Sequence, residues 1–414
     1  MSDRKALDIV TADAVAAAHD RIEAIVHRTP VDSSTTFADM SGASSVGLKL
    51  ENMQRTGSFK IRGAYNTMAQ LSEQTKDRGV IASSAGNHAQ GVALAGDILG
   101  IDTTIVVPEV TPAAKIEATR GYGAEVIVEG KIYEHSYEYA LELAEEMELE
   151  FIHPFNDEGV IAGQGTVGKE LIEQYPTLDT VVVSIGGGGL ISGIATVLKQ
   201  HDPSIRVIGV QPAGAYHAKP SLKRDEIREL SEIDTVAEGI ADTRLLEKTF
   251  TVIREYVDDV VSVSDLEMSV ALTLLAERAK TVVETAGAAP VAALLSDAVD
   301  VRGEHVAAVV SGGNVNLTEH GELTRTGLMH LGRYAEVEIA VDNWPTGVSA
   351  VTTTTESQGA ELDVLERTRR TAQDDPNRTP IRVGIEGSGT EHLQSVIDAL
   401  DSLDELSVTS HTLA

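Results

Sequence analysis

The feature that most constrains this chain is a repeated alternation of short apolar runs with segments of helical periodicity. The runs are rich in β-branched residues and are nearly apolar throughout, which is typical of strands buried on both faces. Such strands, alternating with helices, predict parallel sheets that helices cover on both sides. The runs place strands at residues 79–83, 103–109, 125–130, 180–185, 206–212 and 305–313.

Length and composition narrow the class of protein further. The chain has 414 residues, enough for two or three domains, and no cysteine. Without cysteine there is no disulfide framework, thiolate metal site or cysteine nucleophile. No apolar run is long enough to predict a membrane span, and residues 1–10 do not resemble a signal peptide. We therefore expect a cytoplasmic protein.

Acidic residues are in large excess and are spread along the whole chain, with 64 Asp and Glu against 33 Lys and Arg and a net charge of −31. This charge opposes nucleic acids and anionic membranes as partners, because both need cationic contacts. The chain is not expected to be disordered, since 42% of it is hydrophobic. We interpret the charge as adaptation to high salt, where screening removes self-repulsion. An ordinary acidic cytosolic enzyme is the alternative.

The pattern changes near Gly332. Residues 334–370 predict a strand, a turn, a helix and a second strand, and residues 379–403 predict a strand, a turn and a helix. Residues 371–378 between them are expected to form a polar turn. Together they predict a small α+β unit, large enough for a core of its own. We expect one domain over residues 1–330 and a second over residues 334–414.

Ligands of open parallel sheets bind beyond the carboxyl ends of the strands, so the loops after the strands matter most. The segment SIGGGGLISG, residues 184–193, follows a strand and opens a helix. Four glycines let successive backbone N–H groups point into one concavity, and the helix N-terminus adds partial positive charge. We expect a phosphate site that needs no cationic side chain. The segment is neither G-x-G-x-x-G nor a P-loop, and a flexible turn is the alternative.

Three further segments lie at strand ends or helix starts. SSAGNHAQGVALA, residues 83–95, offers exposed N–H groups that suit a carboxylate, although Ser83, Ser84 and Asn87 are also ordinary capping residues. Ser311 precedes two glycines, and Glu284 precedes small residues that allow a flat ligand to approach closely. An ordinary turn serine and an ordinary helix-start acid are the alternatives for these two.

Lys60 stands in LENMQRTGSFKIRGAYNTMAQ, residues 50–70, where a helical pattern begins after Gly57-Ser58. This stretch alone favours a solvated lysine at a helix start. A phosphate cradle, a carboxylate cradle, a hydroxyl and an amine together suit pyridoxal phosphate bound as an imine. Desolvation between Phe59 and Ile61 would lower the pKa of the amine, as such a role requires.

The segments ENMQRTGSFKIRGA, SSAGNHAQGVA, GGGGL and SGGN occur in that order, and with them the chain resembles the fold-type II pyridoxal-phosphate enzymes, most closely the threonine ammonia-lyases. The resemblance covers nearly the whole chain. It implies two open, twisted parallel sheets of the tryptophan synthase β kind, with pyridoxal 5′-phosphate as cofactor. It also implies elimination of L-threonine, and of L-serine, to a 2-oxo acid and ammonia, with Lys60 removing the α proton.

The resemblance also assigns roles to single residues. Lys60 would hold the cofactor, Phe59 would pack beside its ring, and Asn87 would bond its 3′ oxygen. Ser311 would meet the ring nitrogen. Backbone groups of Gly186, Gly187, Gly188, Gly189 and Leu190 would bind the phosphate, Gly239 and Glu284 would line the cofactor, and Ser83, Ser84, Ala85, Gly86, Asn87 and His88 would receive the substrate carboxylate. The side chain of His88 is expected to be structural.

At two places the sequence departs from the pattern of related racemases, and these departures help to separate a racemase from an elimination enzyme. Related racemases often carry a serine two residues before the loop asparagine, and Ala85 in that place favours elimination. Gln211 and His217 fall nearest the places of a divalent-metal site in racemases, so no metal is expected. Serine racemase, other β-elimination or β-replacement enzymes and a non-catalytic amino-acid-binding regulatory protein remain alternatives. A homo-oligomer, either a dimer or a tetramer, is expected.

Residues 334–414 resemble an ACT domain, a class that commonly binds amino acids. The segment DNWPTG, residues 342–347, is a degenerate version of the Asp-x-Pro-Gly turn of that class. The resemblance implies that Asp342 and Gly347 contact an effector, such as isoleucine or valine, and that the enzyme serves isoleucine biosynthesis. A purely structural oligomerisation domain is the alternative.

Overall fold

The computed structural model describes residues 5–296, 298–370 and 375–413. These divide into two compact units, one of residues 1–271 with 275–316 and one of residues 272–274 with 317–414. The polar turn expected at residues 371–378 falls in part on residues 371–374, which lie outside the described residues.

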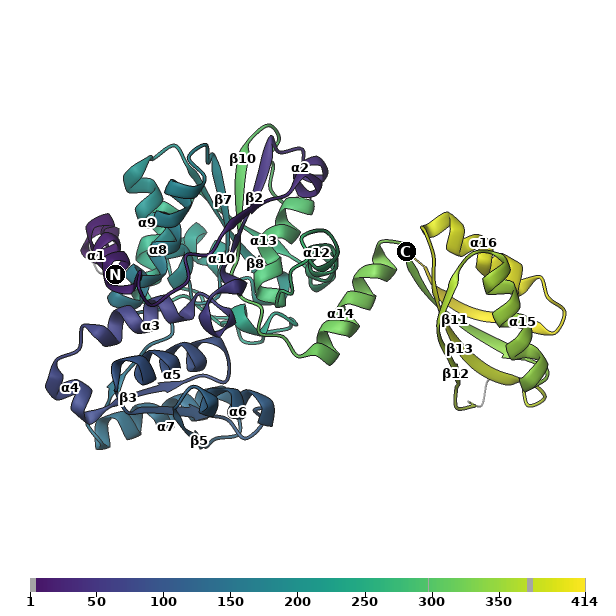
Figure 1. Ribbon diagram of the computed structural model, residues 1–414, viewed down its shortest axis with the longest axis horizontal. Coiled ribbons are helices and arrows are strands. Elements are labelled where there is room, and N and C mark those ends of the chain that lie inside the picture. The colour runs from purple at the N-terminus through teal and green to yellow at the C-terminus, as the bar shows by residue number, and fades with distance from the viewer. Residues whose placement is uncertain (1–4, 297, 371–374, 414) are drawn as a thin grey trace. The chain divides into compact units, whose positions relative to one another are not determined.

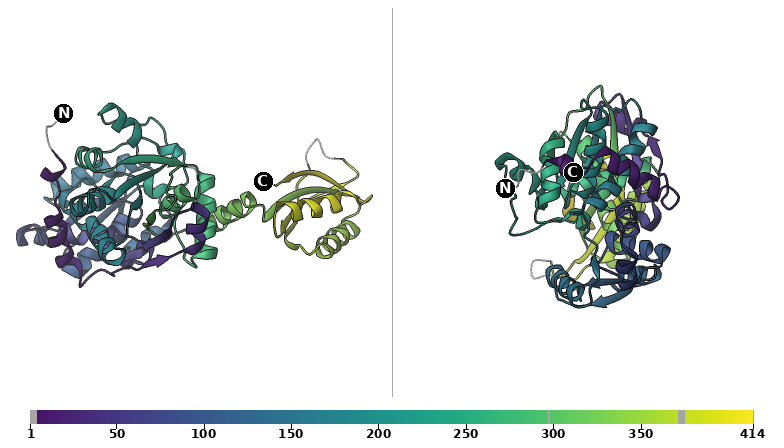
Figure 2. Two further views of the ribbon diagram at one scale, coloured as in Figure 1. Left: turned by 90° about the horizontal axis from the view of Figure 1, so that it is seen from above. Right: turned by 90° about the vertical axis from the view of Figure 1, so that its left-hand side faces the viewer.

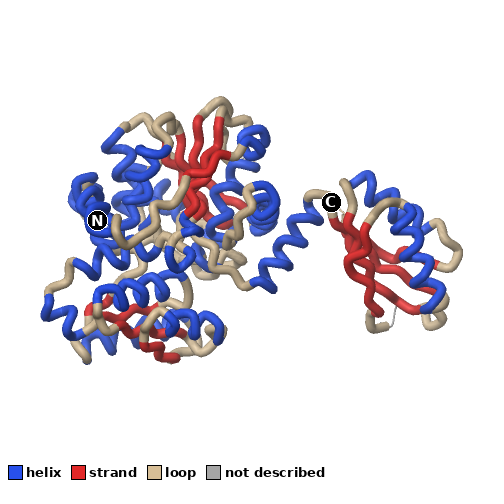
Figure 3. The backbone as a smooth tube through the Cα atoms, in the orientation of Figure 1, coloured by secondary structure: helices blue, strands red, loops and turns tan. Residues whose placement is uncertain are grey.

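The first unit contains two open sheets with helices on their faces, as Figures 1 and 3 show. The larger sheet has six strands in the order β1-β2-β10-β7-β8-β9. Only the β1–β2 pair is antiparallel. The strands are β1 (Val31–Ser33), β2 (Ser45–Leu50), β7 (Thr180–Ser184), β8 (Arg206–Pro212), β9 (Asp259–Val263) and β10 (His305–Val310).

The smaller sheet has four strands in the order β5-β4-β3-β6, and all of them are parallel. They are β3 (Val80–Ser83), β4 (Thr103–Val107), β5 (Glu125–Val128) and β6 (Glu150–Phe151). Each strand predicted from an apolar run is present, as β3, β4, β5, β7, β8 and β10. The two parallel sheets expected from the resemblance are thereby confirmed.

Capping residues determine where two of the helices begin or end. Asp157 accepts the backbone N–H of Val160 and starts α8, and Gly100, in the left-handed conformation with φ 68°, ends α5. The helices of this unit are α1 (Ala12–Ile22), α2 (Thr35–Ser41), α3 (Lys60–Ala69), α4 (Glu73–Arg78), α5 (Asn87–Leu99), α6 (Ala113–Gly121), α7 (Tyr133–Glu146), α8 (Glu158–Gln174), α9 (Gly189–His201), α10 (Ala218–Arg224), α11 (Glu247–Tyr256), α12 (Asp265–Arg278) and α13 (Thr285–Leu295). Short 3₁₀ turns are η1 (Ala6–Asp8), η2 (Glu51–Met53), η3 (Arg55–Gly57), η4 (Ala213–Ala215) and η5 (Glu238–Ile240).

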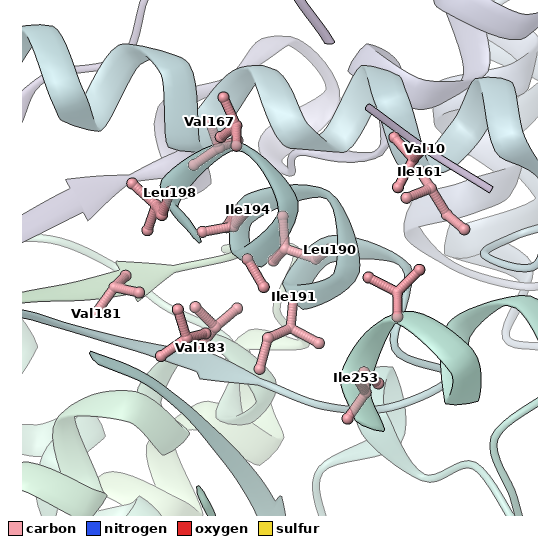
Figure 4. Packing of buried hydrophobic residues seen from close by; sticks show 14 of the residues in the cluster. Val10, Ile161, Val167, Val181, Val183, Leu190, Ile191, Ile194, Leu198 and Ile253 are labelled. Atoms are coloured by element: carbon pink, nitrogen blue, oxygen red, sulfur yellow. The ribbon is translucent and has the colours of Figure 1, made fainter. Parts of the chain in front are cut away.

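Helices α8 and α9 form the core beside the larger sheet. Figure 4 shows Ile161 and Val167 of α8 close to Leu190 and Ile194 of α9, and all four are buried in one cluster. The two backbones approach so closely at Gly193 that a Cβ there would lie 2.3 Å from the carbonyl oxygen of Ile161. This packing fixes the start of α9, which is where the glycine loop ends.

The second unit is a four-stranded antiparallel sheet in the order β12-β13-β11-β14. Helices α15 and α16 lie on one side of it in Figures 1 and 2. Val337 and Ile339 of the sheet share an apolar core with Leu393 of α16. This is the small α+β unit that the sequence predicted. Its elements are α14 (Leu317–His330), β11 (Tyr334–Val341), α15 (Trp344–Ser357), β12 (Glu361–Arg367), β13 (Thr379–Glu386), α16 (Thr390–Asp401) and β14 (Leu406–Thr412). Over the described residues of both units, no helix has the length and hydropathy that a membrane span needs.

Candidate active site

The lysine segment joins the larger sheet to α3, which begins at Lys60. Two left-handed residues, Thr56 with φ 61° and Gly57 with φ 71°, turn the chain just before it. Ser58 then pairs with Gly312, and the backbone N–H of Phe59 donates to the carbonyl oxygen of Ser311 at 3.3 Å. The lysine turn is thus held against the loop that follows β10.

The amine of Lys60 is desolvated by the groups around it. It donates to the carbonyl oxygen of Pro154 at 3.0 Å and lies 5.3 Å from the centroid of the Phe59 ring. Burial lowers the pKa of the amine to about 8, although the charges of Asp242 and Glu284 act in the opposite direction. Near neutral pH a much larger fraction of this amine is therefore neutral than in an ordinary lysine, whose pKa is 10.5.

The glycine loop runs from the end of β7 into α9. A Cβ at Gly187 would lie 2.3 Å from the ring of Phe155, and one at Gly186 would lie 2.5 Å from Oδ2 of Asp242. Gly188 has φ 89°, which favours glycine, and Gly189 and Leu190 form the first turn of α9. Since no side chain fits along the loop, its lining is backbone, as a phosphate cradle requires. These residues fit the phosphate of pyridoxal phosphate.

Sequence reasoning missed Asp242, which directly follows the segment AEGIA at residues 237–241. Its carboxylate accepts a hydrogen bond from the backbone N–H of Gly187. Burial raises the pKa of Asp242, and the nearby Lys60 and this hydrogen bond oppose that rise. An acid after AEGIA was visible in the sequence, but its residue type alone did not distinguish it from a surface acid.

Asn87, at the start of α5, and Glu284, just before α13, are hydrogen-bonded to each other. Nδ2 of Asn87 donates to Oε1 of Glu284 at 2.8 Å, and Nδ2 of Asn314 donates to Oδ1 of Asn87 at 2.7 Å. Burial raises the pKa of Glu284 to about 7 despite the Asn87 hydrogen bond and the charges of Lys115 and Lys60. A Cβ at Gly312 would lie 2.3 Å from the same carboxylate oxygen. The structure therefore brings Asn87 and Glu284 together near Lys60.

Two other predicted cofactor contacts lie beside this pair. Ser311 is buried and directly follows β10, and its carbonyl oxygen accepts the backbone N–H of Phe59 in the lysine turn. A Cβ at Gly239 would lie 3.6 Å from Oε1 of Glu284 and 3.1 Å from Cβ of Ala286. Gly239 thus faces the Asn87–Glu284 pair, as a residue lining a flat ligand would.

The carboxylate loop follows β3 and ends at the start of α5. Ser83 is buried and its hydroxyl has no hydrogen-bond partner among the described residues. Ser84 Oγ accepts the backbone N–H of Gly86 at 3.2 Å, and the space beyond Gly86 is open. Ala85 between them is an apolar residue that packs against the hydrophobic cluster beside the smaller sheet.

The side chain of His88 is buried and bonded to the backbone. Its Nε2 lies 2.8 Å from the carbonyl oxygen of Ile152, and burial, with the charge of Lys60, lowers its pKa to about 3. The imidazole is therefore neutral at any ordinary pH and donates to that carbonyl. A structural side chain was expected for His88, and its contribution to a carboxylate site would come from its backbone.

Gln211 and His217 form a buried neutral pair. Nε2 of Gln211 lies 2.9 Å from Nε2 of His217, and Oε1 of Gln211 accepts the backbone N–H of Ala218 at 2.8 Å. Burial lowers the pKa of His217 to about 4. In the described parts of the chain, no three His, Asp or Glu residues come together in a way that could hold a metal ion.

The two predicted effector residues lie in the second unit. Oδ1 of Asp342 is 2.7 Å from Nε of Arg378, so this carboxylate is already paired with a cation. Gly347 is buried in α15, and a Cβ there would lie 2.5 Å from Cβ of Val341. In this structure Gly347 therefore allows α15 to pack closely against β11.

The fold and this set of residues define a pyridoxal-phosphate enzyme, and comparison with known proteins agrees. The chain belongs to the family described as "Pyridoxal-phosphate dependent enzyme", whose profile matches residues 22–312. It is 44% identical over 337 residues to the L-threonine ammonia-lyase of Thermotoga maritima, covering 81% of this chain and 84% of that protein. It is 40% identical over 390 residues to the L-threonine ammonia-lyase of Geobacter sulfurreducens, covering 94% of this chain and 96% of that protein. Among solved structures, maize serine racemase superposes with a TM-score of 0.73 at 38% identity, covering 78% of this chain and 99% of that one.

Proposed function

We propose that this chain catalyses the α,β-elimination of L-threonine to 2-oxobutanoate and ammonia, and of L-serine to pyruvate and ammonia. The observation that carries the proposal is the desolvated amine of Lys60, placed beside a backbone-lined glycine loop and the Asn87–Glu284 pair. The two relatives named as L-threonine ammonia-lyases support the choice of substrate, since they match most of the chain.

The cofactor would be held by groups that the structure supplies. When bound, pyridoxal phosphate supplies an aldehyde carbon that joins to an amine and a ring that withdraws electrons from the substrate Cα. Gly186, Gly187, Gly188, Gly189 and Leu190 would hold its phosphate through backbone N–H groups. Phe59 would pack beside the ring, Gly239 would allow its close approach, Asn87 and Glu284 would lie at its edge, and Ser311 would meet its nitrogen.

Lys60 would act as the general base that takes the α proton, because burial leaves part of its amine neutral near neutral pH. The loop at residues 83–88 would hold the substrate carboxylate by its N–H groups and by the unpartnered hydroxyl of Ser83. Ala85 offers no proton donor on the opposite face of the substrate. We therefore favour elimination over racemisation, which needs a donor on that face.

The test is an assay for 2-oxo acid and ammonia from L-threonine and L-serine with pyridoxal phosphate present. We expect stoichiometric formation of both products, and absorbance at about 410–420 nm from a cofactor joined to a lysine. D-serine formed from L-serine without ammonia would point to a racemase instead. Amino-acid binding with neither product would point to a regulatory protein.

We also propose that residues 334–414 form an ACT-like regulatory domain, following a catalytic domain of residues 1–330. The support is that the second unit has an apolar core of its own while every residue proposed for the chemistry lies in the first unit. A branched-chain amino acid is the effector class that we favour, with Asp342 and Gly347 as its contacts. This regulation would suit a cytoplasmic enzyme of isoleucine biosynthesis.

Adaptation to high salt and a homo-oligomeric state complete the proposal. The support for salt adaptation is the net charge of −31 spread over 414 residues, which destabilises a compact chain unless salt screens it. The oligomer, a dimer or a tetramer, is checked by light scattering in molar potassium chloride.

A further inference from the structure

Two charged residues of the lysine segment, Glu51 and Arg62, take no part in the site described above. Both are fully buried. Glu51 begins η2, and Arg62 lies in the first turn of α3, two residues after Lys60. Burial of a charge is strongly unfavourable unless partners compensate it, so their contacts show what they hold in place.

The guanidinium of Arg62 lies between two carboxylates and binds each of them twice. Its Nε and Nη2 donate to Glu51 at 2.8 and 2.7 Å. Its Nη1 and Nη2 donate to Glu170 of α8 at 2.6 and 3.1 Å. A second cation, Lys49 of β2, donates to Oε2 of Glu170 at 2.5 Å. We call Lys49, Glu51, Arg62 and Glu170 the clamp, whose four charges sum to zero.

Further hydrogen bonds complete the clamp. Nη1 of Arg62 also donates to Oγ1 of Thr166 at 3.1 Å, and the hydroxyl of Thr29 donates to Oε1 of Glu51 at 2.5 Å. Burial alone would raise the pKa of Glu51, but Arg62 and Lys49 hold it below its ordinary value, so this carboxylate is ionised. Glu51 and Arg62 thus form a buried ion pair rather than a neutral hydrogen-bonded pair.

The clamp ties three other segments to the first turn of α3. Its members come from β2, η2, α3 and α8, and a planar guanidinium that binds carboxylates on two sides fixes orientation as well as distance. The backbones of α3 and α8 also touch at the same level, since a Cβ at Gly163 would lie 2.6 Å from the carbonyl oxygen of Arg62. These contacts hold the first turn of α3, which begins at Lys60, against α8.

The clamp does not reach the amine itself. The hydrogen bond from Lys60 goes to Pro154, and the charges that raise its pKa belong to Asp242 and Glu284, which lie outside the clamp. Any effect of the clamp on the amine is therefore exerted through the position of α3.

We propose that Glu51 and Arg62 are positioning residues for Lys60, and that the clamp places the amine where it meets the cofactor carbon. This inference rests on the proposed function for what the amine does.

The test compares Arg62→Lys, which keeps the charge and loses the paired hydrogen bonds, with Phe37→Ala. Phe37 is a fully buried residue of α2, outside the site and the clamp, and its truncation lowers stability by leaving a cavity in the core. Each protein in molar salt is mixed with pyridoxal phosphate, reduced with borohydride after a series of short times, and mapped for label on Lys60. Turnover of L-threonine is measured on the same samples.

For Arg62→Lys we expect labelling of Lys60 at least ~10-fold slower and kcat at least ~10-fold lower, with KM changed less than ~3-fold, as for a misplaced base. Phe37→Ala should label and turn over at wild-type rates. Wild-type rates in a folded, less stable Arg62→Lys protein would overturn the inference and reduce the clamp to a structural feature. Absence of label on Lys60 in the wild-type protein would instead overturn the proposed function.

A milder variant decides the question if Arg62→Lys does not fold. Thr166→Val is nearly isosteric and removes one hydrogen bond from Arg62 while all four clamp charges remain. We expect its labelling rate and kcat to fall about 3-fold together, the loss that corresponds to one weak hydrogen bond. Wild-type values for both would overturn the inference.

Discussion

The side-chain amide of Asn87 donates a 2.8 Å hydrogen bond to the carboxylate of Glu284 and so links the first turn of α5 to the residue that precedes α13. Asn87 follows the smaller sheet, and Glu284 belongs to the half of the unit built on the larger sheet. The bond therefore spans the two subdomains at the place where the cofactor ring is proposed to lie. Burial raises the pKa of Glu284 to about 7, so this carboxyl group changes its protonation state near neutral pH.

The first prediction concerns stability against pH in protein freed of cofactor. Because the pKa of Glu284 is about 7 when folded and 4.5 in the reference state, the folded chain binds more protons between these values. The contribution of Glu284 to stability is present below about pH 4.5 and is lost as the pH rises to about 7. The shift corresponds to a change of about 3 to 4 kcal/mol in the free energy of unfolding. Urea unfolding of wild type and Glu284→Gln in molar salt should show this component in the wild type alone. Equal pH profiles would contradict it.

The second prediction is that Lys60→Ala loses elimination activity by at least ~10³-fold, because a nucleophile and base are removed together. Its absorbance at about 410–420 nm with pyridoxal phosphate should also vanish. Lys76→Ala is the matched control, since Lys76 lies on α4 and pairs with Glu73 at 2.8 Å. Borohydride label on a lysine other than Lys60 would contradict the assignment.

The third prediction concerns the glycine loop. Gly187→Ala would place a methyl group 2.3 Å from the ring of Phe155, so either the loop or the ring must move. We expect the affinity for pyridoxal phosphate to fall at least ~10-fold, which corresponds to about 1.4 kcal/mol. Gly121→Ala in α6 is the control, because no atom lies within 4 Å of a Cβ there. Absorbance titration with the cofactor measures both, and equal affinities would exclude the loop as the phosphate site.

Strands β3, β4, β5, β7, β8 and β10 could be predicted from the sequence because each is a clear apolar run. The lysine turn could be predicted for a similar reason, since its glycine and serine mark a turn locally. Strands β1, β2, β6 and β9 were not predicted. Strand β6 has only two residues, too few for any periodicity, and β2 carries the buried Lys49, whose charge is compensated by Glu170 from α8. No local window contains both residues of that pair. The acid Asp242 was missed for the same reason, because its importance comes from contact with the glycine loop.

The fourth prediction concerns salt. With a net charge of −31, repulsion between surface carboxylates should destabilise the chain at low ionic strength and be screened at molar salt. The melting temperature should therefore rise steadily from low to molar potassium chloride, and activity lost on dilution should return with salt. An equal rise with sucrose at matched osmolality would show that exclusion from the surface, rather than charge screening, is responsible. A melting temperature that does not change with potassium chloride would refute the adaptation.

The fifth prediction concerns the proposed regulatory domain. Removal of residues 334–414 should leave the absorbance of the lysine-bound cofactor and the elimination activity, since the proposed chemistry uses only residues of the first unit. Any response to isoleucine or valine should disappear. Coupling of ordinary size, about 1–3 kcal/mol, would appear in the full chain as a ~5- to 150-fold change in apparent affinity for threonine.

Asp342→Asn provides the matched point variant for this domain. It removes the charge that faces Arg378 at 2.7 Å and keeps the shape of the side chain. If Asp342 meets the ammonium group of an effector, the variant should weaken the response to isoleucine or valine and leave the basal rate unchanged. Calorimetric titration of the full chain in molar salt measures effector binding directly. If neither amino acid binds and neither changes the rate of the wild-type enzyme, residues 334–414 have a structural role, such as oligomerisation, which light scattering of the truncated chain would then reveal.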